Sequence, residues 1–363
     1  MTLQDILAIR LANEQLTSSK FKTPEALVKW FGAVQSQDYS GAKWALGQRL
    51  GLNDLQLEQA FNEVKILRTH VMRPTWHFVH PDDLVWMQKL TSPRVKRIMN
   101  YYNKILGLDA QIFEKTNKII ADVLKGENYL TRLEIKNILE KKGVFASTQK
   151  LGHIVSWAEL DSIICSGPLR LRSGQARGGQ FTYALTAELT PKTKELTTDE
   201  ALRELTNRYF MSHGPATVRD FVWWSGLLTA DVRRGIELAK LKSENVEGKQ
   251  YWFAKSSLTT NYILPATMYL LPNYDEYTIA YQDRDAYINP HTVIYFKNQG
   301  NAAFWNAIVY KGEIIGMWRK TLVKNSMNVQ VRFFEKLNTD ERRALEEATD
   351  SYSKFLGIPV ETK

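Results

Sequence analysis

The sequence predicts an α+β fold made of three tandem winged-helix units followed by a small antiparallel β-barrel. Three stretches repeat one layout, which is a helix, a helix-turn-helix and then a strand pair. From about residue 256 short β-rich segments replace this layout. With 363 residues the chain is more than twice as long as a typical domain of ~150 residues, and its 44% hydrophobic and 24% charged residues are ordinary for a globular protein.

The first unit, residues 1–112, has the loosest pattern. Thr23-Pro24 predicts the start of a helix whose apolar positions continue to Val34, and further helices are predicted at 40–50 and 54–64. A candidate strand at 71–79 contains Pro74. Because proline cannot donate to a strand ladder, this strand is expected at a sheet edge or a bulge.

The second unit, residues 113–190, has the clearest pattern. Thr131 and Glu134 have capping-box spacing at the start of one helix, and Ser147 can cap the next helix, which Gly167-Pro168 is expected to end. A strand pair follows around the glycine-rich, basic loop 173–179. Two helices followed by such a hairpin are typical of a winged helix.

The third unit, residues 191–256, repeats the layout. Thr197 and Glu200 give another capping box, and a helix that starts at Thr217 is expected to stop at Gly226. The next helix begins at Thr229, so a glycine lies in the short turn between two helices, as a helix-turn-helix requires. A strand pair at 241–246 and 250–254 completes the unit.

The C-terminal region, residues 257–363, has a β-rich pattern that closes with a helix near 339–356. Its predicted strands lie at 262–271, 277–281, 291–297, 305–310, 313–322 and 327–334. This spacing predicts a small antiparallel sheet or barrel.

The positive charge of the chain is concentrated in one third of its length. The chain has 48 Lys+Arg, 39 Asp+Glu and a formal net charge of +9, and residues 65–180 alone hold 19 Lys/Arg and 10 Asp/Glu. Such clustering favours double-stranded DNA as the partner, because phosphate contacts are made by Lys and Arg gathered on one face. Repeated helix-turn-helix units also serve as protein-interaction scaffolds, so that alternative stays open.

Several classes of function are disfavoured. No apolar run approaches the ~18 residues of a membrane span and the N-terminus has no secretion-signal pattern, so we expect no membrane association and a cytoplasmic, nucleoid-associated monomer. The single cysteine, Cys165, excludes a disulfide framework, and its place in an apolar helix end favours a packing role. Since no phosphate-binding or dinucleotide motif and no His/Cys metal spacing occurs, we expect no cofactor and no metal.

One polar segment is a candidate for chemistry. Gln35-Ser36-Gln37-Asp38 follows the apolar part of the first predicted helix. Residues two apart on a helix diverge by about 200°, so the two glutamines can line one pocket only if the helix ends at Val34 or Gln35 and the chain then extends.

Other polar and aromatic residues are expected to be structural. Asp275 and Glu276 are expected to bind Arg319 or backbone groups within the barrel, with an electrostatic link to the glutamines as the alternative. For Trp223-Trp224, core packing is favoured over base stacking. The isolated His213 reads as a hydrogen-bonded structural histidine.

Five motifs, in order, carry a resemblance to a known family. They are Ala33-Val34-Gln35-Ser36-Gln37-Asp38-Tyr39 with Gly41-Ala42-Lys43-Trp44-Ala45-Leu46-Gly47, Arg73-Pro74-Thr75-Trp76-His77, Ser212-His213-Gly214-Pro215-Ala216-Thr217 running into 220–226, Leu270 to Tyr277, and Gly316 to Leu322. In this order they resemble the AlkZ/YcaQ family of bacterial winged-helix DNA glycosylases over about the whole chain. The resemblance implies three winged helices and a β-barrel that form a concave DNA-binding surface. It also implies excision of alkylated, notably N7-substituted, purines from duplex DNA, and for some members the unhooking of interstrand crosslinks.

The resemblance also assigns the candidate site residues. The family's catalytic Gln-x-Gln/Asp motif maps onto Gln35 and Gln37, and Ser36 stands where an apolar residue is usual. Arg73 and His77 lie in a family motif near the site and are expected to contact DNA, to support the site or to pack. Phosphate contacts are expected from basic residues beside the second unit, at Arg94, Lys96, Arg97, Arg170, Arg172 and Arg177.

Two glutamines suit the chemistry of a cationic lesion. An N7-alkylguanine carries a positive charge, so the base departs neutral without a strong general acid. The remaining task is to hold a water molecule below C1′ of the deoxyribose, and a glutamine carbonyl can accept a water hydrogen and fix its direction. No lysine nucleophile is implied, so a monofunctional, metal-independent glycosylase is expected. The alternative is a winged-helix DNA-binding or regulatory protein without activity.

Overall fold

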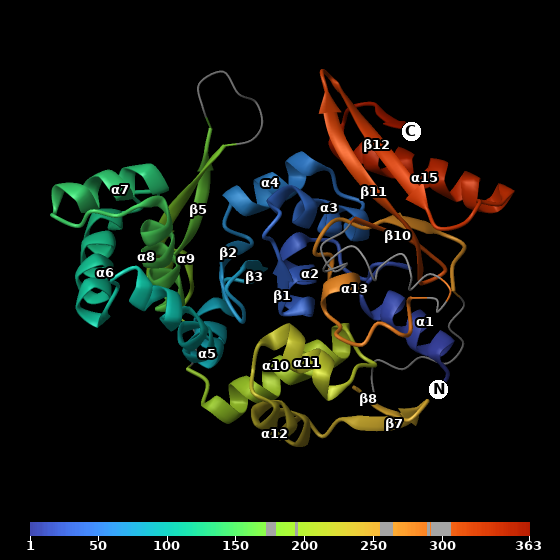
Figure 1. Ribbon diagram of the computed structural model, residues 1–363, viewed down its shortest axis with the longest axis horizontal. Coiled ribbons are helices and arrows are strands. Elements are labelled where there is room, and N and C mark those ends of the chain that lie inside the picture. The colour runs from blue at the N-terminus through green and yellow to red at the C-terminus, as the bar shows by residue number, and fades with distance from the viewer. Residues whose placement is uncertain (172–178, 193–194, 255–263, 289–290, 292–305) are drawn as a thin grey trace.

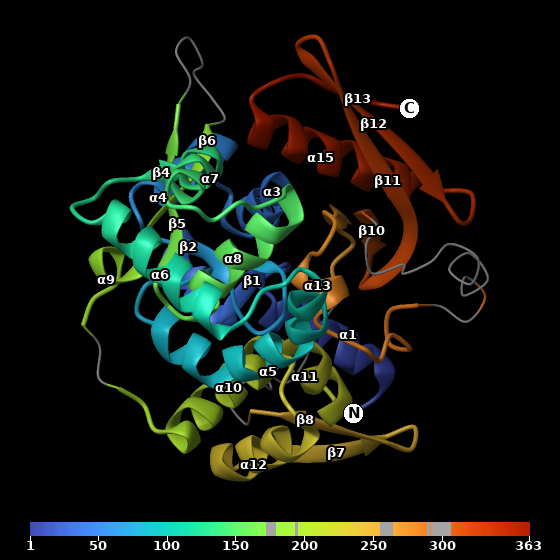
Figure 2. The same cartoon turned by 60° about the vertical axis from the view of Figure 1, so that its left-hand side comes forward.

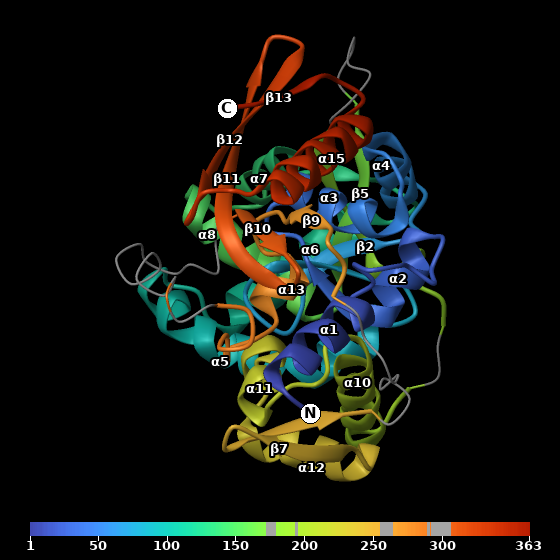
Figure 3. The same ribbon diagram turned by 90° about the vertical axis from the view of Figure 1, so that its right-hand side faces the viewer.

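The computed structural model describes residues 1–171, 179–192, 195–254, 264–288, 291 and 306–363, and the fold is α+β, as predicted. Figure 1 shows the N-terminal elements at the centre, with the 110–189 elements on the left, the 198–253 elements below and the C-terminal sheet on the right. The side facing the viewer in Figure 3 carries α15 against the curved C-terminal sheet.

The N-terminal region surrounds a small antiparallel sheet with the strand order β1-β3-β2. Its elements are α1 (Leu3–Asn13), α2 (Pro24–Phe31), β1 (Ala33–Gln35), α3 (Tyr39–Leu50), α4 (Asp54–Asn62), β2 (Leu67–His70), β3 (Trp76–Val79) and α5 (Leu84–Ile105). The helices predicted at 40–50 and 54–64 are α3 and α4. The first predicted helix ends before Val34, because Gly32 at φ 85° turns the chain into β1.

The strand predicted at 71–79 was too long. Residues 71–75 form a tight connection, with hydrogen bonds from Arg73 N to Val71 O at 2.6 Å and from Thr75 N to Arg73 O at 2.7 Å. Only β3 is a strand, and it lies in the middle of its sheet rather than at the edge. Pro74 is in the connection, where its missing N–H does not interrupt the hydrogen bonds between strands.

The second region has its own hydrophobic core and a three-stranded sheet of order β4-β6-β5. It contains α6 (Ala110–Leu124), β4 (Leu130–Thr131), α7 (Arg132–Lys141), α8 (Thr148–Leu160), β5 (Ile164–Arg170), β6 (Gln180–Leu185) and α9 (Thr186–Leu189). The capping box of Thr131 and Glu134 and the cap by Ser147 are confirmed. Gly167-Pro168 does not end a helix but lies in β5, where Thr182 of β6 approaches Gly167 closely. Cys165 is buried in the same strand rather than in a helix end.

The third region follows the predicted order. It contains α10 (Thr198–Ser212), α11 (Val218–Ser225), α12 (Thr229–Ala239), β7 (Lys242–Val246) and β8 (Lys249–Phe253). The capping box of Thr197 with Glu200 is confirmed, and Gly226 ends α11 in the left-handed conformation. Trp224 is fully buried in the core, as expected, whereas Trp223 is partly exposed.

The C-terminal region forms a five-stranded sheet of order β13-β12-β11-β10-β9. Its elements are β9 (Met268–Leu270), α13 (Glu276–Ile279), β10 (Asn306–Tyr310), β11 (Glu313–Val323), β12 (Ser326–Phe333), α15 (Thr339–Leu356) and β13 (Val360–Thr362). The closing helix is confirmed at its predicted position. The segment predicted as a strand at 277–281 is instead the short helix α13, and β13 pairs with β12 in parallel. Most of the strand predicted at 291–297 lies outside the described residues.

The hydrophobic cores join distant parts of the chain. One core contains Ile6 and Leu7 of α1, Phe221 and Trp224 of α11, and Tyr277 of α13. The predicted division into four units stays a prediction, and contacts of this core cross its boundaries. Among the described residues, no helix is both long and apolar enough to cross a membrane.

Candidate active site

Gln35 lies on extended backbone, whereas Gln37 lies in the bend that leads to α3. Gln35 is the last residue of β1, where it is opposite His77 of β3, and Ser36 N donates to Trp76 O at 2.8 Å. The preceding helix ends at Phe31, so the helical spacing that would turn the two side chains apart does not apply. A pocket shared by Gln35 and Gln37 stays a prediction.

The two glutamine side chains contact adjoining segments of the chain. Gln35 Oε1 accepts a hydrogen bond from Arg73 Nη2 of the connection between β2 and β3 at 2.8 Å, and Gln37 Oε1 accepts one from Trp76 N, at the start of β3, at 3.3 Å. Gln35 is only 4% exposed, whereas Gln37 is exposed. The structure thus joins Gln35 to Arg73 and Gln37 to the start of β3, with Gln37 toward solvent.

The connection is itself held by α5 and by the third region. Met72 has a left-handed φ of 63°, and its amide donates to Thr91 Oγ1 of α5 at 3.1 Å. On the other side, Gly226 packs so closely that a Cβ there would lie 2.4 Å from Met72 O and 3.7 Å from Arg73 Cγ. The position of Arg73 therefore depends on α5 and on the end of α11.

A buried carboxylate holds the backbone of Gln35. Glu276, which is 1% exposed, accepts from Gln35 N through Oε1 at 2.8 Å and from Trp224 Nε1 through Oε2 at 2.8 Å. His213 Nε2 lies 3.3 Å from the same Oε2. Burial alone would raise the pKa of Glu276, but the hydrogen bonds from His213, Gln35 and Trp224 hold that pKa below its usual value. The carboxylate is therefore ionised at neutral pH.

The helix that carries Glu276 is anchored by an adjacent ion pair. Arg49 of α3 donates to both oxygens of Asp275 at 2.8 Å, and it also pairs with Glu14 at 3.2 Å. Of the expected partners, Arg319 was wrong, because Arg319 is exposed on β11 while Asp275 binds Arg49 and Glu276 binds Gln35. A backbone group of the C-terminal region is confirmed for Asp275, whose Oδ1 accepts from Tyr277 N at 3.0 Å. The alternative, a link between this segment and Gln35, is present as a direct hydrogen bond.

His77 lies beside Gln35 but is buried. It is 1% exposed, and its Nδ1 is 2.9 Å from Thr75 O. Burial, and then the charge of Arg73, lower the pKa of His77 well below its usual value, so the ring is neutral. With Nδ1–H donating to Thr75, Nε2 is an acceptor, and it has no hydrogen-bond partner within the described residues.

The candidate DNA contacts are spread over two regions. On α5, Arg97 is exposed and Arg94 is half-buried, while Lys96 is paired with Asp161. At the end of β5, Arg170 is exposed and pairs with Glu134 at 2.7 Å. Arg172 and Arg177 lie outside the described residues. The other two candidate DNA contacts, Arg73 and His77, lie beside Gln35, and Arg73 donates a hydrogen bond to it.

A cleft separates the two hairpins that extend to the same end of the molecule. Figure 2 shows β5 and β6 on one side and β11 and β12 on the other, with α3 between them. The cleft at the base of these hairpins has a volume of about 540 Å³ and is lined in part by Ser40, Lys43, Phe181 and Lys320. Lys320 reaches Ser40 Oγ at 3.1 Å, so β11 contacts the start of α3 just beyond Gln37.

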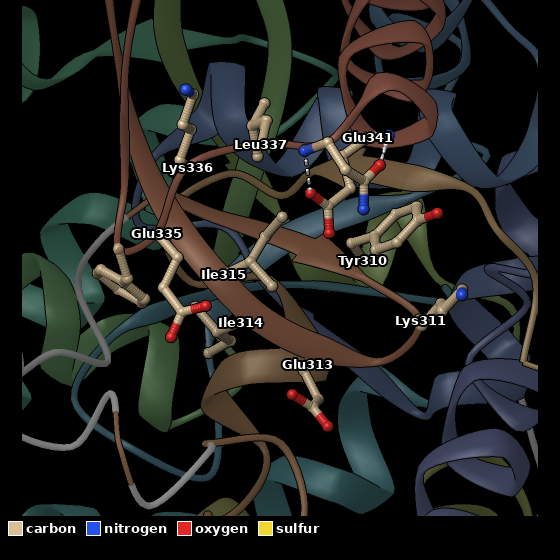
Figure 4. Close-up of a pocket in the computed structure, with 11 residues that line it drawn as sticks. Tyr310, Lys311, Glu313, Ile314, Ile315, Glu335, Lys336, Leu337 and Glu341 are labelled. Carbon is tan, nitrogen blue, oxygen red and sulfur yellow. Dashed lines mark hydrogen bonds between the residues drawn. The ribbon is translucent and has the colours of Figure 1, made fainter.

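A second pocket lies on the C-terminal sheet, away from the glutamines. Its volume is about 430 Å³, and Tyr310, Glu313, Ile315 and Glu335 are among its lining residues (Figure 4). Glu341, also drawn there, donates its amide to Oδ1 of Asn338, the residue that caps α15. This pocket therefore does not contain the candidate chemistry. Within the described residues, no three His, Cys, Asp or Glu side chains are grouped so that they could hold a metal ion.

The sequence missed the contacts of His213 and Trp224 with Glu276, and it gave a link from Glu276 to the glutamines only as the alternative. All three occur in the motifs that carry the family resemblance, which is the one signal that marked them. Glu276 lies 52 positions from Trp224, 63 from His213 and 241 from Gln35 in the chain, so no local spacing could have predicted these contacts.

Known proteins resemble the chain over most of its length. The family model for the AlkZ-like DNA glycosylases matches residues 28–355. An interstrand DNA cross-link repair glycosylase of Streptomyces sahachiroi is 21% identical over 335 residues, which are 87% of each chain. The solved structure of the Streptomyces sahachiroi DNA glycosylase AlkZ superimposes with a TM-score of 0.80 at 19% identity and covers both chains completely. The chain therefore belongs to the AlkZ-like DNA glycosylase family.

Proposed function

We propose that the protein is a monofunctional, metal-independent DNA glycosylase that hydrolyses the N-glycosidic bond of N7-alkylated purines in duplex DNA. The observation that carries the proposal is that Gln35 and Gln37 bind adjoining positions, Arg73 in the connection before β3 and Trp76 at the start of β3, in a member of this family. Gln35 and Gln37 are the proposed catalytic residues.

In the proposed mechanism the two carboxamides orient a water molecule toward C1′. A carbonyl oxygen has two lone pairs, so Gln35 Oε1 can accept from a water molecule while it accepts from Arg73. As the glycosidic bond stretches, positive charge moves from the base to the sugar, and a water molecule held in line attacks the developing cation. An amide is too weak a base to deprotonate water fully, so the attacking water loses its proton to solvent as the C1′–O bond forms, and the carboxamides lower the barrier by positioning.

The fold supports a DNA complex of the following kind. We propose that 1–112, 113–190 and 191–256 act as winged-helix units and that 257–363 acts as the β-barrel, with the hairpins on either side of the 540 Å³ cleft contacting the duplex. Arg94, Lys96, Arg97 and Arg170, with Arg172 and Arg177, are the proposed phosphate contacts. We propose a cytoplasmic monomer, and the name of the Streptomyces relative makes crosslinked duplex a second substrate to test.

The experiment measures release of free base from duplexes that contain N7-methylguanine, in the presence of a chelator. We expect release by the wild-type protein, and loss of release in Gln35→Ala with Gln37→Ala while DNA affinity stays within a few-fold. Gln111→Ala, which removes an exposed glutamine of α6, is the matched control and should release base normally. Equal release by the double variant and the wild-type protein would refute the catalytic assignment. A crosslinked duplex assayed in parallel defines the substrate range.

One observation favours a second candidate, a DNA-binding protein without glycosylase activity. Gln35 is 4% exposed, and its carbonyl oxygen already accepts from Arg73. A protein of this kind would bind duplex DNA but release no base from any lesion duplex. The same assay separates the two functions, because affinity and base release are measured on one set of duplexes.

A further inference from the structure

Two charged residues from distant parts of the chain hold Gln35 at its two ends. Glu276 accepts from the backbone N–H at 2.8 Å, and Arg73 donates to the side-chain Oε1 at 2.8 Å. These contacts span 241 and 38 residues of sequence. The glutamine that the proposed mechanism needs is therefore fixed from outside its own strand.

The direction of the Arg73 contact has chemical meaning. A glutamine carboxamide is nearly symmetric in shape, and a half-turn exchanges its carbonyl oxygen with its amino group. An arginine guanidinium has only donors, so it pairs with the oxygen and rejects the amino group. Arg73 thus selects one of two orientations of the Gln35 side chain.

The environment of Arg73 makes this contact selective. Arg73 Nε is buried and has no hydrogen-bond partner in the described part of the chain, and burial lowers the pKa of this guanidinium below its usual value. The charge of Glu276 offsets part of that burial cost, so the two residues act as a charge pair around Gln35. The Arg73 side chain as a whole is half-buried, but its Nε is enclosed and its Nη2 donates to Gln35, so little of the guanidinium remains for a phosphate at the surface.

We infer that Arg73, with Glu276 as its counter-charge, is a positioning residue that orients the Gln35 carboxamide for base release, and not a DNA contact. This inference rests on the proposed glycosylase function. Because Arg73 acts through Gln35, its effect requires that Gln35 be present. The sequence-based expectation of a DNA contact at Arg73 makes the opposite prediction for DNA affinity.

The first test compares Arg73→Met, which keeps the aliphatic length and removes the donors, with the wild-type protein under single-turnover conditions. We expect the rate of N7-methylguanine release at saturating protein to fall about 10- to 100-fold, because a misplaced reacting group costs rates of this order. The dissociation constant for duplex DNA should stay within about threefold. Arg73→Lys, which keeps one donor and the charge, should recover part of the rate. Arg343→Met, at an exposed arginine of α15, is the matched control and should not change the rate.

A thermodynamic cycle separates positioning from general damage. In the Gln35→Ala background, Arg73→Met should change the residual rate less than about twofold, because the side chain that it orients is gone. Glu276→Gln removes the charge and leaves one oxygen, which can accept from Gln35 N while the NH2 group replaces the oxygen that accepts from Trp224 Nε1. Because the counter-charge of Arg73 is then lost, the loss of rate in Glu276→Gln should not add fully to that of Arg73→Met. Full additivity with Gln35→Ala would overturn the inference. So would an unchanged rate of Arg73→Met together with weaker DNA binding and a shallower salt dependence.

A measurement without catalysis tests the inference even if the wild-type protein releases no base, a result that would refute the proposed function alone. In protein labelled with ¹⁵N-glutamine, the side-chain NH₂ signals of Gln35 are those absent from Gln35→Ala. Arg73→Met should shift these signals, and Arg343→Met should leave them in place. Unchanged Gln35 signals in Arg73→Met would show that Arg73 does not orient the carboxamide.

Discussion

At the scale of single residues, burial determines which protonation state His77 can adopt beside Gln35. Its pKa is lowered well below the usual value, first by burial and then by the charge of Arg73. The ring is therefore neutral where a cationic phosphate contact would need a charge. The sequence motif placed His77 near the site, but it could not show that the side chain is 1% exposed.

The same burial predicts how stability changes with pH. An unfolded histidine, with a pKa near 6.5, takes up a proton as the pH falls, while folded His77 does not, so the free energy of unfolding decreases below about pH 6.5. Between pH 7.5 and 5.5 one such histidine contributes a loss of roughly 1.4 kcal/mol. We expect His77→Gln to remove about this share of the pH dependence measured by urea unfolding. His213, whose pKa is also lowered chiefly by burial, should still contribute to the pH dependence that remains in His77→Gln.

Gln111→Ala, at an exposed residue of α6 that does not titrate, provides the control for this measurement and should keep the pH dependence of the wild-type protein. An identical pH dependence in His77→Gln and the wild-type protein would mean that His77 is protonated in the folded state as readily as in the unfolded state.

At the scale of elements, the sequence predicted what local contacts determine. The capping boxes at Thr131 and Thr197 and the stop at Gly226 occur as expected, because a cap is formed by residues within one turn. Val34 was assigned to a helix because its apolar spacing fits one, yet it pairs with Phe78 in β1. The segment predicted as a strand at 277–281 is the helix α13, which Asp275 caps. Asp275 also binds Arg49 of α3, 226 residues away, and the local sequence does not show a contact over that distance.

The end of α11 connects the third region to the candidate site, and Gly226→Ala tests that connection. Gly226 has a φ of 70°, and an added Cβ would meet Met72 O at 2.4 Å. Gly51 ends α3 at a similar φ of 67° but has no neighbouring atom within 4 Å of such a Cβ. We expect Gly51→Ala to reduce the free energy of unfolding by about 1–2 kcal/mol, the cost of a left-handed alanine. Gly226→Ala should cost roughly 1–3 kcal/mol more, because overpacking is added.

Base release distinguishes a local displacement from a general loss of stability. Gly226→Ala moves the backbone that carries Arg73, so its rate should fall at temperatures where the variant is fully folded. Gly51→Ala should keep the wild-type rate. Equal unfolding free energies of the two variants would show that the connection moves aside without cost.

At the scale of the whole molecule, the basic residues of 65–180 fall on α5 to β6 and the segments that flank them, and some of these cations are paired. Lys96 binds Asp161, Arg170 binds Glu134 and Lys89 binds Glu195. The number of Lys and Arg residues in the segment therefore overstates how many are available to phosphates. Within the described residues Arg97 is exposed and has no ion-pair partner, which makes it the strongest of the proposed contacts to test.

Salt titration of duplex binding measures how many phosphates the protein contacts. The logarithm of the association constant falls with the logarithm of salt concentration, with a slope of about −0.9 for each neutralised phosphate. We expect a steep negative slope for the wild-type protein and a slope that is shallower by about 0.9 for Arg97→Gln, with affinity reduced equally on lesion-bearing and undamaged duplexes. Arg343→Gln, on the exposed face of α15, should keep the wild-type slope. A wild-type slope near zero would contradict DNA binding and would favour the protein-interaction scaffold. An unchanged slope in Arg97→Gln would place the phosphate contacts elsewhere on the molecule.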